Sequence, residues 1–211
     1  MVKWIIAYSS ATGNTRRLAE AAAKKIGADI INVQDLIGTA NIRDNDDDEV
    51  SISIGHNSLA VSTEVLEKNI SKKLAPYDGV MVGYWLRRGA PDKKASILLS
   101  RITGKKVALF QTHGAYEGTE HAITAFARAG SLLGAGNKIL GTFSCQGAVN
   151  PMLIKKRLEG SVPGHRGENL EECKKRWADA ASKPNENDLK RMEDFAARMD
   201  AIAERESKSY I

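Results

Sequence analysis

The chain has 211 residues, 42% of them hydrophobic, and 31 lysines and arginines against 26 acidic residues give it a net charge of +5. This length and apolar content suffice for one buried core and argue against two independent domains. No stretch approaches the roughly 20 apolar residues of a membrane-spanning helix, and the apolar run near Met1 is too short for a secretory signal. We therefore expect a cytoplasmic protein without a membrane partner.

The basic residues fall in scattered pairs and short runs, such as Lys24-Lys25 and Lys155-Lys156-Arg157. No aromatic-rich or recognisable nucleic-acid motif accompanies them, so solvated helix faces explain them better than nucleic-acid binding. An acidic or anionic partner stays open. Cys145 and Cys173 stand far apart without a CxxC or Cys/His cluster, which predicts reduced structural thiols and neither a disulfide nor a metal site.

Short apolar runs alternate with stretches of helical periodicity along the chain. Strands are predicted over residues 3–8, 28–33, 79–84, 106–111 and 138–144, and helices over 14–26, 63–74, 93–102 and 119–133. The near-continuous apolar runs at 80–83 and 107–110 suit strands that are buried on both faces. This alternation predicts an α/β fold, a three-layer, doubly wound, five-stranded parallel sheet with right-handed crossovers.

Two segments exceed this plan. Residues 38–62 contain an acidic run and then an alternating stretch, which predicts an inserted loop with a short extra strand or hairpin. Residues 161–211 carry a charged helix from about Leu170 to Ala181 and a second helix, after Pro184, whose apolar stripe favours core packing or a docking face. We therefore expect a domain over 1–160 and a helical extension over 161–211 packed on it. Covering the site or building a homodimer are the two roles open to the extension.

A turn crowded with hydroxyl groups follows the first strand and leads directly into the first helix. The start of a helix offers unpaired backbone N–H groups and a positive dipole end, so it attracts a phosphate without needing a lysine. Neither GxxxxGK[ST] nor GxGxxG is present, which excludes the two commonest rival phosphate loops. The alternative is that Ser10 or Thr12 merely caps the helix. The residues of this turn are Ser9, Ser10, Ala11, Thr12, Gly13, Asn14 and Thr15.

The run Ser10-Ala11-Thr12-Gly13-Asn14-Thr15 resembles the phosphate loop of the flavodoxin family, which follows the first strand and reads [ST]-x-T-G-N-T. The resemblance extends more loosely over residues 3–150. The stretches at 83–94 and 104–122 look like those of flavodoxin-like proteins of anaerobic bacteria, some of which support bilin reduction. The resemblance implies strand order 2-1-3-4-5 and a non-covalently bound flavin mononucleotide (FMN) beyond the carboxyl ends of the strands, where the winding reverses.

The loops after the third and fourth strands should then meet the flavin ring. A flat, mostly apolar isoalloxazine needs aromatic stacking and polar contacts at its edge, and each loop offers an aromatic residue and glycines. Trp85 and Tyr116 are the expected ring neighbours, unless either fills the core beneath its loop. The predicted FMN-binding residues of the two loops are Tyr84, Trp85, Leu86, Arg87, Arg88, Gly89, Thr112, His113, Gly114, Tyr116 and Gly118.

The pair Arg87-Arg88 departs from electron-shuttling flavodoxins, which are strongly acidic and carry an acidic or small-residue loop here. A fixed positive charge near the pyrimidine edge of the ring would favour the anionic reduced flavin. The alternative is that both arginines point to solvent or bind an acidic partner. His113 is a candidate to hydrogen-bond the flavin or a substrate, although a loop histidine is more often a surface hydrogen-bonding residue.

The leading functional hypothesis is an FMN electron-transfer protein that takes electrons from a reduced donor and passes them to a partner reductase. The second is an FMN-dependent reductase that acts directly on a quinone or tetrapyrrole. The third is a flavin-free regulatory module, because receiver domains share this strand order, but they need acidic residues where Tyr8, Ser9 and Ser10 stand. No nucleophile paired with a base and no metal-ligand spacing is found, so we expect the chemistry to belong to the cofactor.

Overall fold

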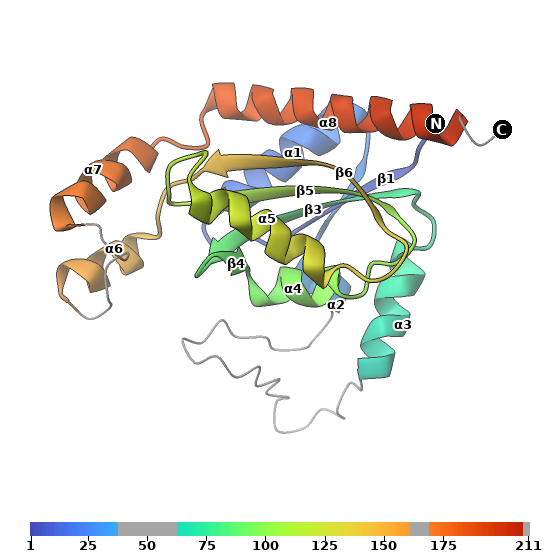
Figure 1. Cartoon of the computed structure of the whole chain (residues 1–211), viewed down its shortest axis with the longest axis horizontal. Coiled ribbons are helices and arrows are strands. Elements are labelled where there is room, and N and C mark those ends of the chain that lie inside the picture. The colour runs from blue at the N-terminus through green and yellow to red at the C-terminus, as the bar shows by residue number, and fades with distance from the viewer. Residues whose placement is uncertain (38–62, 161–168, 209–211) are drawn as a thin grey trace.

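A computed structural model describes residues 1–37, 63–160 and 169–208, and its main strands form one parallel sheet (Figure 1). The strand order is β2-β1-β3-β5-β6, which confirms the predicted α/β class and the 2-1-3-4-5 arrangement. The insertion predicted at 38–62 lies outside the described residues. The strands are β1 (Trp4–Tyr8), β2 (Asp29–Asn32), β3 (Gly79–Arg87), β5 (Lys106–His113) and β6 (Lys138–Gln146).

The third predicted strand is longer than its apolar run. β3 continues past Tyr84 to Arg87, and the chain then turns back as the two-residue strand β4 (Ala90–Pro91), which pairs antiparallel with the end of β3. Arg88 and Gly89, between the two strands, have φ values of 51° and 76°. Positive φ at both central positions is typical of two-residue hairpin turns. The segment predicted as a loop is therefore a β-hairpin.

Helices cover both faces of the sheet (Figure 1). The core on one face lies under α1 and α8, and the core on the other face lies under α2, α3, α4 and α5. Within the described part of the chain, no helix combines the length and apolar character needed to cross a membrane. The helices of these layers are α1 (Asn14–Ile26), α2 (Val33–Ile37), α3 (Thr63–Leu74), α4 (Lys93–Leu99), α5 (Glu120–Leu132) and α8 (Glu186–Lys208).

The apolar stripe of α8 is part of the core. Met192, Phe195, Ala196 and Met199 are buried in the same cluster as the inward side chains of α1. The rings of Phe195 and Phe143 of β6 pack with their centroids 5.6 Å apart. α8 therefore completes one layer of the fold, together with α1.

Two glycines of β3 leave room for aromatic rings on the face under α1 and α8. Gly79 pairs with Trp4 of β1, and Gly83 pairs with Phe110 of β5. A Cβ atom added at Gly79 would lie 2.5 Å from the Trp4 ring, and one at Gly83 would lie 2.1 Å from the Phe110 ring. Each ring therefore covers the glycine with which its own residue pairs, and neither position has room for a side chain.

Two further helices stand at the carboxyl ends of the strands, outside the layers (Figure 1). They are α6 (Pro151–Leu158) and α7 (Leu170–Ala180), which follow β6 and precede α8. We call these two helices the arm. α7 corresponds to a predicted helix, whereas α6 was not predicted. α6 begins at the N-cap Asn150, and a proline follows at its first turn, a common start for a helix.

Candidate functional site

The turn after β1 lies at the carboxyl edge of the sheet and leads into α1, as predicted. Its N-cap residue, Gly13, has a φ of 89°, and the space where a Cβ would stand is open. The amide of Arg17 donates to the Gly13 carbonyl oxygen at 3.0 Å and begins the helical hydrogen bonding. The amides of residues 14–16 precede this bond and have no acceptor within the helix.

The start of α1 differs from the starts of α4, α5, α6 and α7. Side chains of Asp92, Asn150 and Asn169 cap α4, α6 and α7, whereas α1 has no side-chain cap and no acidic residue in its first turn. α5 also lacks a side-chain cap but carries Glu120 in its first turn. Arg16 occupies the corresponding part of α1. This start is electropositive and rich in amide donors, so it fits a phosphate group and contradicts the alternative in which Ser10 or Thr12 caps the helix.

Ser9 ties the turn to α4 instead of facing outward. It is buried, and its Oγ donates to Asp92 Oδ1 at 2.8 Å. The same carboxylate oxygen accepts from the amides of Lys94 and Ala95, at 3.1 and 3.2 Å. The Ser9 side chain therefore braces the turn, and a contact of Ser9 with the ligand stays a prediction. The role of Asp92 as N-cap of α4 and partner of Ser9 was not predicted, although an aspartate directly before a helix is a common N-cap residue.

Asn14 and Thr15 also brace the turn with their side chains. Asn14 Nδ2 donates to the Ala148 carbonyl oxygen at 2.9 Å, where the chain leaves β6. The hydroxyls of Thr15 and Thr112 of β5 lie 2.8 Å apart, and both residues are buried. The side chains of Asn14, Thr15 and Thr112 therefore support the turn, and their contacts with the ligand stay predictions.

The remaining residues of the turn lie closer to solvent. Ala11 and Thr12 are exposed. Ser10 Oγ accepts from the Gly13 amide at 3.1 Å, inside the turn. The donors left for a phosphate include the backbone amides at the start of α1 and the hydroxyls of Ser10 and Thr12.

Tyr84 is a core residue. Its side chain has no exposed surface and lies in the core under α2–α5, and its hydroxyl has no hydrogen-bond partner among the described residues. Burial raises the pKa of the Tyr84 phenol far above its usual range. The side chain of Tyr84 therefore packs in the core, and a contact of this residue with FMN stays a prediction. Trp85, the next residue of β3, is half-buried and faces the opposite side of the sheet, toward α1. Its contact with a flavin stays a prediction.

The hairpin of β3 and β4 packs against α5. Arg128 Nη1 donates to the Gly89 carbonyl oxygen at 2.8 Å, and a Cβ at Gly89 would lie 2.9 Å from the His121 ring. Arg87 is half-buried and Arg88 is exposed, at the same edge of the sheet as the phosphate turn. Leu86 packs on the core under α2–α5. Contacts of the two arginines or of Gly89 with a flavin stay predictions.

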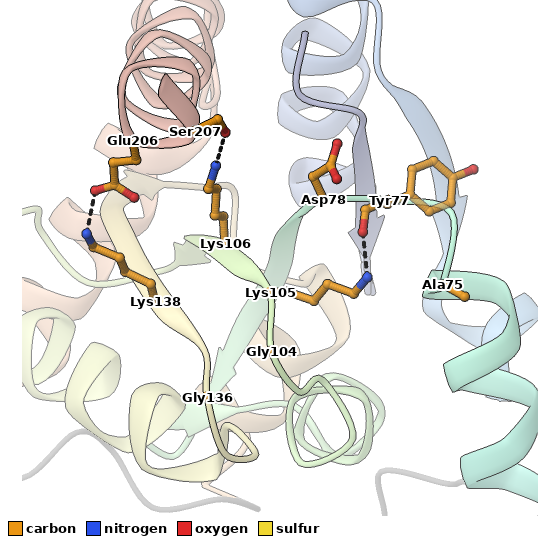
Figure 2. A pocket seen from close by; sticks show the side chains of 10 residues that line it. All are labelled: Ala75, Tyr77, Asp78, Gly104, Lys105, Lys106, Gly136, Lys138, Glu206 and Ser207. Atoms are coloured by element: carbon orange, nitrogen blue, oxygen red, sulfur yellow. Dashed lines mark hydrogen bonds and ion pairs between the residues drawn. The ribbon is translucent and has the colours of Figure 1, made fainter. Parts of the chain in front are cut away.

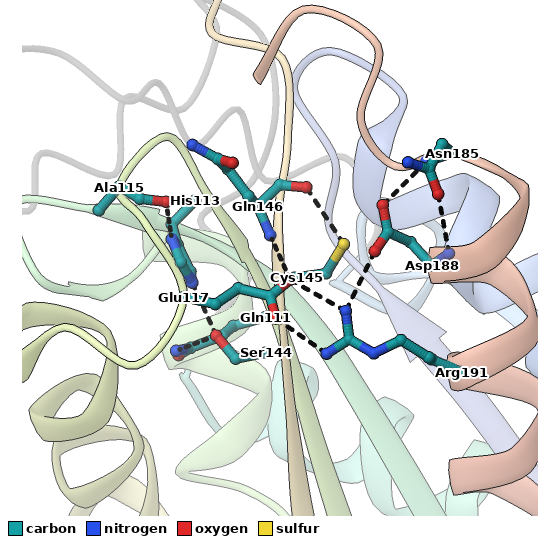
Figure 3. A network of polar contacts seen from close by, with 10 residues as sticks. All are labelled: Gln111, His113, Ala115, Glu117, Ser144, Cys145, Gln146, Asn185, Asp188 and Arg191. Carbon is teal, nitrogen blue, oxygen red and sulfur yellow. Dashed lines mark hydrogen bonds and ion pairs between the residues drawn. The ribbon is translucent and has the colours of Figure 1, made fainter. Parts of the chain in front are cut away.

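His113 lies at the end of β5 in a chain of polar contacts (Figure 3). Nδ1 lies 3.1 Å from the Ala115 carbonyl oxygen, so it donates, and Nε2 accepts from Ser144 Oγ at 2.6 Å. Ser144 Oγ in turn lies 3.3 Å from Gln111 Nε2. Burial lowers the pKa of His113 to about 4, so the ring is neutral at pH 7. Both nitrogens bind protein atoms, which argues against the predicted hydrogen bond to a flavin or substrate.

A second polar network joins the loop after β5 to α8 (Figure 3). Arg191 Nη2 lies 2.8 Å from Glu117, and Nη1 lies 3.1 Å from Asp188. Burial acts to raise the pKa of Glu117, but the hydrogen bond and charge of Arg191 outweigh it and hold the pKa below its usual range. The Cys145 sulfur and one carboxylate oxygen each from Glu117 and Asp188 lie within 4.8 Å of one another, close enough to hold a metal ion. Burial raises the pKa of the Cys145 thiol to about 12. Arg191 pairs with both carboxylates, so these residues form an ion-pair network that joins the loop after β5 to α8.

The arm holds the loop after β5 from the other side. Arg176 of α7 is buried, and its Nη1 donates to the Gly114 carbonyl oxygen at 2.6 Å. Tyr116 is 41% exposed and donates its hydroxyl hydrogen to Asp179 of α7 at 2.7 Å. Gly118, with a φ of 76°, makes the turn before α5. Stacking of Tyr116 on a flavin ring, and any contact from Gly114 or Gly118, stay predictions. The contacts of Arg176 and Asp179 with this loop could not be predicted from local sequence patterns, because the residues that they join are more than 60 positions apart.

A cleft of about 380 Å³ lies at the opposite edge of the sheet, at the amino ends of the strands (Figure 2). Its lysine ammonium groups all bind protein oxygens and tie the elements together. These pairs are Lys105 with the Tyr77 carbonyl at 2.5 Å, Lys106 with the Ala203 carbonyl at 2.9 Å, and Lys138 with the Glu206 carboxylate at 2.6 Å. The cleft therefore lacks cations aimed at a ligand, and the carboxyl edge is the better candidate site.

Comparison with known families decides the classification. A family model described as Flavodoxin domain matches residues 48–197, more than half of the chain. The chain belongs to the flavodoxin domain family. The matched range of this flavodoxin domain protein begins after the turn between β1 and α1 and ends within α8.

Similar proteins are spread over several bacteria. The flavodoxin-like domain-containing protein BilS of Clostridioides difficile (strain CD3) is 27% identical over 200 residues, which cover 94% of this flavodoxin domain protein and 96% of BilS. A solved flavoprotein in complex with FMN from Lactobacillus acidophilus NCFM is 15% identical, with 68% of this chain and 93% of that chain covered and a TM-score of 0.40. Oxidised flavodoxin 2 from Bacillus cereus is 18% identical, with coverages of 84% and 94% and a TM-score of 0.43. TM-scores below 0.5 are too low to establish a fold, so the fold assignment rests on the strand order of the sheet.

Proposed function

We propose that this protein binds FMN without a covalent bond at the carboxyl edge of its sheet and carries electrons from a reduced donor to a partner reductase. The observation that carries the proposal is the start of α1, where Gly13 is left-handed and the following amides have neither a side-chain cap nor an acidic neighbour in the first turn. Such a start suits a phosphate monoester. Membership of the flavodoxin domain family supports FMN as the molecule that carries this phosphate.

The residues divide into those that would hold the ligand and those that support them. The amides at the start of α1 and the Thr12 hydroxyl would bind the phosphate, and Trp85 and Tyr116 would flank the ring. Asp92 supports the turn through Ser9. When bound, FMN supplies the capacity to take up and release one or two electrons.

The supporting residues favour a carrier over an enzyme that reduces a small acceptor directly. Reduction of a quinone or tetrapyrrole is helped by a positioned proton donor near the flavin. His113, the residue predicted to hydrogen-bond the flavin or a substrate, is buried, neutral and bonded at both nitrogens, so it does not supply such a donor. A cytoplasmic location and a homodimer remain predictions.

Substitution of Thr12 by glutamate tests the phosphate site. A carboxylate at the start of α1 favours the helix dipole, so the fold should keep or gain stability, while its charge repels the phosphate. We expect the wild-type protein to retain FMN absorbance after desalting and Thr12→Glu to bind FMN at least about tenfold more weakly, a loss of about 1.4 kcal/mol. Fluorescence titration with FMN measures the affinity, and thermal unfolding checks the fold.

The matched control is Lys25→Gln, which makes the same change in net charge at the other end of α1, where Lys25 is exposed. It should bind FMN like the wild type. A well-folded wild-type protein without affinity for FMN would contradict the proposal. Rapid oxidation of NAD(P)H by the FMN-loaded protein with a quinone, in the absence of any partner, would replace the carrier with a reductase.

A further inference from the structure

α6 presents its side chains to the surface. None of its eight residues is buried, and Met152, Leu153 and Leu158 expose 62%, 37% and 52% of their surface. Lys155 and Lys156 are exposed on the same helix. A helix of a globular protein normally buries an apolar stripe. α6 therefore carries apolar surface that the described part of the fold does not use.

Cations lie directly beside these apolar side chains. Residues four apart are neighbours on a helix surface, so Met152 lies beside Lys156, and Leu153 beside Arg157. The basic last turn suits the helix dipole. The helix dipole explains the basic residues of the last turn, but it does not explain why large apolar side chains are exposed beside them.

Hydrogen bonds hold the segment between β6 and α6 beside the candidate FMN site. Where the chain leaves β6, the Gly147 amide donates to the His113 carbonyl oxygen at 2.9 Å, and Asn14 holds the Ala148 carbonyl. Beyond α6, Arg176 of α7 binds the loop after β5. Figure 1 shows α6 at the same end of the sheet as the β3–β4 hairpin. α6 thus lies beside the edge that a redox partner must approach.

From these observations we propose that the exposed surface of α6, residues 152–158, docks an acidic redox protein that presents carboxylates around an apolar patch. This inference rests on the proposed function, because the acidic protein would be a redox partner of the FMN electron carrier. Interface centres are apolar and enriched in Met and Arg, with a charged rim. Electron-transfer encounters bury little area and depend on charge for fast association. Two turns of mixed apolar and basic residues suit such a small interface.

An anionic membrane is the other surface that attracts a basic helix with apolar residues. Helices that lie on membranes separate an apolar face from a charged face. In α6 the spacing of 100° per residue places Lys156 between Met152 and Leu153, and Arg157 between Leu153 and Ile154. The two kinds of side chain therefore alternate around the helix. This pattern favours a protein surface with carboxylates among apolar groups.

The test uses the FMN-loaded full-length protein and a small acidic ferredoxin as the probe. Reduced ferredoxin, freed of reductant, is mixed with the protein under anaerobic conditions, and FMN absorbance gives the second-order rate constant. Calorimetric titration with oxidised ferredoxin measures binding separately. We expect Lys155→Glu with Lys156→Glu to lower the rate constant about tenfold at low ionic strength and to weaken binding in parallel. The difference should shrink as salt is added. Met152→Ser should lower the rate constant severalfold at every salt concentration.

The control is Lys24→Glu with Lys25→Glu, the same change in net charge at the far end of α1, where the rate constant should change less than about twofold because the site is distant. Lys155→Gln with Lys156→Gln separates charge from helix stability, and circular dichroism checks that the helix content is kept. Lys155 also forms an exposed ion pair with Glu159 at 3.9 Å, whose loss is too small to explain a tenfold change. Chemical reduction of FMN by dithionite should be the same in all variants.

Three results would overturn the inference. Equal slowing of the α6 and α1 variants would show an effect of net charge alone. Unchanged rate constants in both α6 variants would exclude this surface, and binding of wild type to phosphatidylglycerol vesicles with unchanged rate constants would assign α6 to a membrane. Failure of the proposed function looks different, because the absorbance spectrum then shows no retained FMN before ferredoxin is added. Calorimetry still reports in that case whether the α6 surface binds the acidic protein.

Discussion

His113 shows how burial changes what a residue can do. A histidine beyond a strand end can act as a proton donor near pH 7, but here burial disfavours the charged ring. The Ala115 carbonyl and the charge of Glu117 favour protonation and only partly offset this effect, and His121 adds to it. The neutral ring instead fixes the start of the loop after β5 through its bond to Ala115.

The lowered pKa predicts a stability that depends on pH. The pKa of an unfolded histidine is near its ordinary value of 6.5, and the pKa of folded His113 is about 4, so between these values the unfolded chain binds more protons. The contribution is therefore present above pH 6.5, falls as the pH drops toward 4, and levels off below. Its size is roughly 3 kcal/mol. Urea unfolding at several pH values should show this slope in the wild type and in His121→Gln, but not in His113→Gln. Identical slopes in His113→Gln and wild type would refute the assignment.

At the scale of residues, the sequence indicates the phosphate turn but not the partners of its side chains. Ser9 bonds to a residue 83 positions away, and Thr15 to one 97 positions away. Local patterns contain no information on such partners. Tyr84 and Trp85 are a different case, because alternation along a strand separates them once the strand is known to continue past Tyr84.

At the scale of elements, α7 and the loop after β5 form one unit. Arg176 is buried and reaches the Gly114 carbonyl, and Asp179 accepts from Tyr116. A hydrogen bond from a charged group contributes about 1.5–3 kcal/mol. Much of the order of a loop that the proposal places against the flavin thus depends on a helix outside the layers of the fold.

Substitution of Arg176 by methionine tests this dependence. The change keeps the apolar stem and removes the donor to Gly114, so amides of residues 114–119 should exchange with solvent about tenfold faster or more. Hydrogen–deuterium exchange by mass spectrometry measures this. Lys175→Met, at an exposed position of the same helix, should leave the exchange unchanged. Unchanged protection in Arg176→Met would show that the loop is ordered without α7.

Three of the described elements were not predicted from the sequence. The helix α2 is buried but has five residues, too few to show a helical period, whereas α6 and β4 bury little. The main strands and the longer helices of the layers follow apolar periodicity because each buries one side in a core. α6 buries no side chain, so it has no periodicity to detect. β4 has two residues and is defined by its pairing with β3, which a pattern of side chains does not reveal.

At the scale of the whole molecule, α8 closes the core on one face of the sheet. A division of the chain at residue 160 separates this helix from the strands with which it packs. The two helices of the arm stand between β6 and α8 in the sequence, which obscures that connection. The strand order was predictable because alternating strands and helices with right-handed crossovers leave few arrangements.

Phe195 provides a test of that closure. Phe195→Ala removes a ring that is 1% exposed and packs on Phe143, so the free energy of unfolding should fall by about 3–5 kcal/mol. Circular dichroism and tryptophan fluorescence during urea unfolding should report one shared transition, since α8 and the sheet form one core. Asp194→Ala, which removes an exposed ion pair with Lys190, should cost less than about 1 kcal/mol. Separate transitions for the two probes would show that α8 unfolds independently.

The aromatic rings over Gly79 and Gly83 also bear on how the strands find their alignment during folding. Sliding β3 by two residues keeps its inward and outward sides but brings Met81 beneath the ring of Trp4 or of Phe110. A methionine side chain cannot share the space that those rings need above a bare backbone. Misaligned pairings of the central strand are therefore penalised on both of its edges, and the correct alignment is selected by shape as well as by backbone hydrogen bonds.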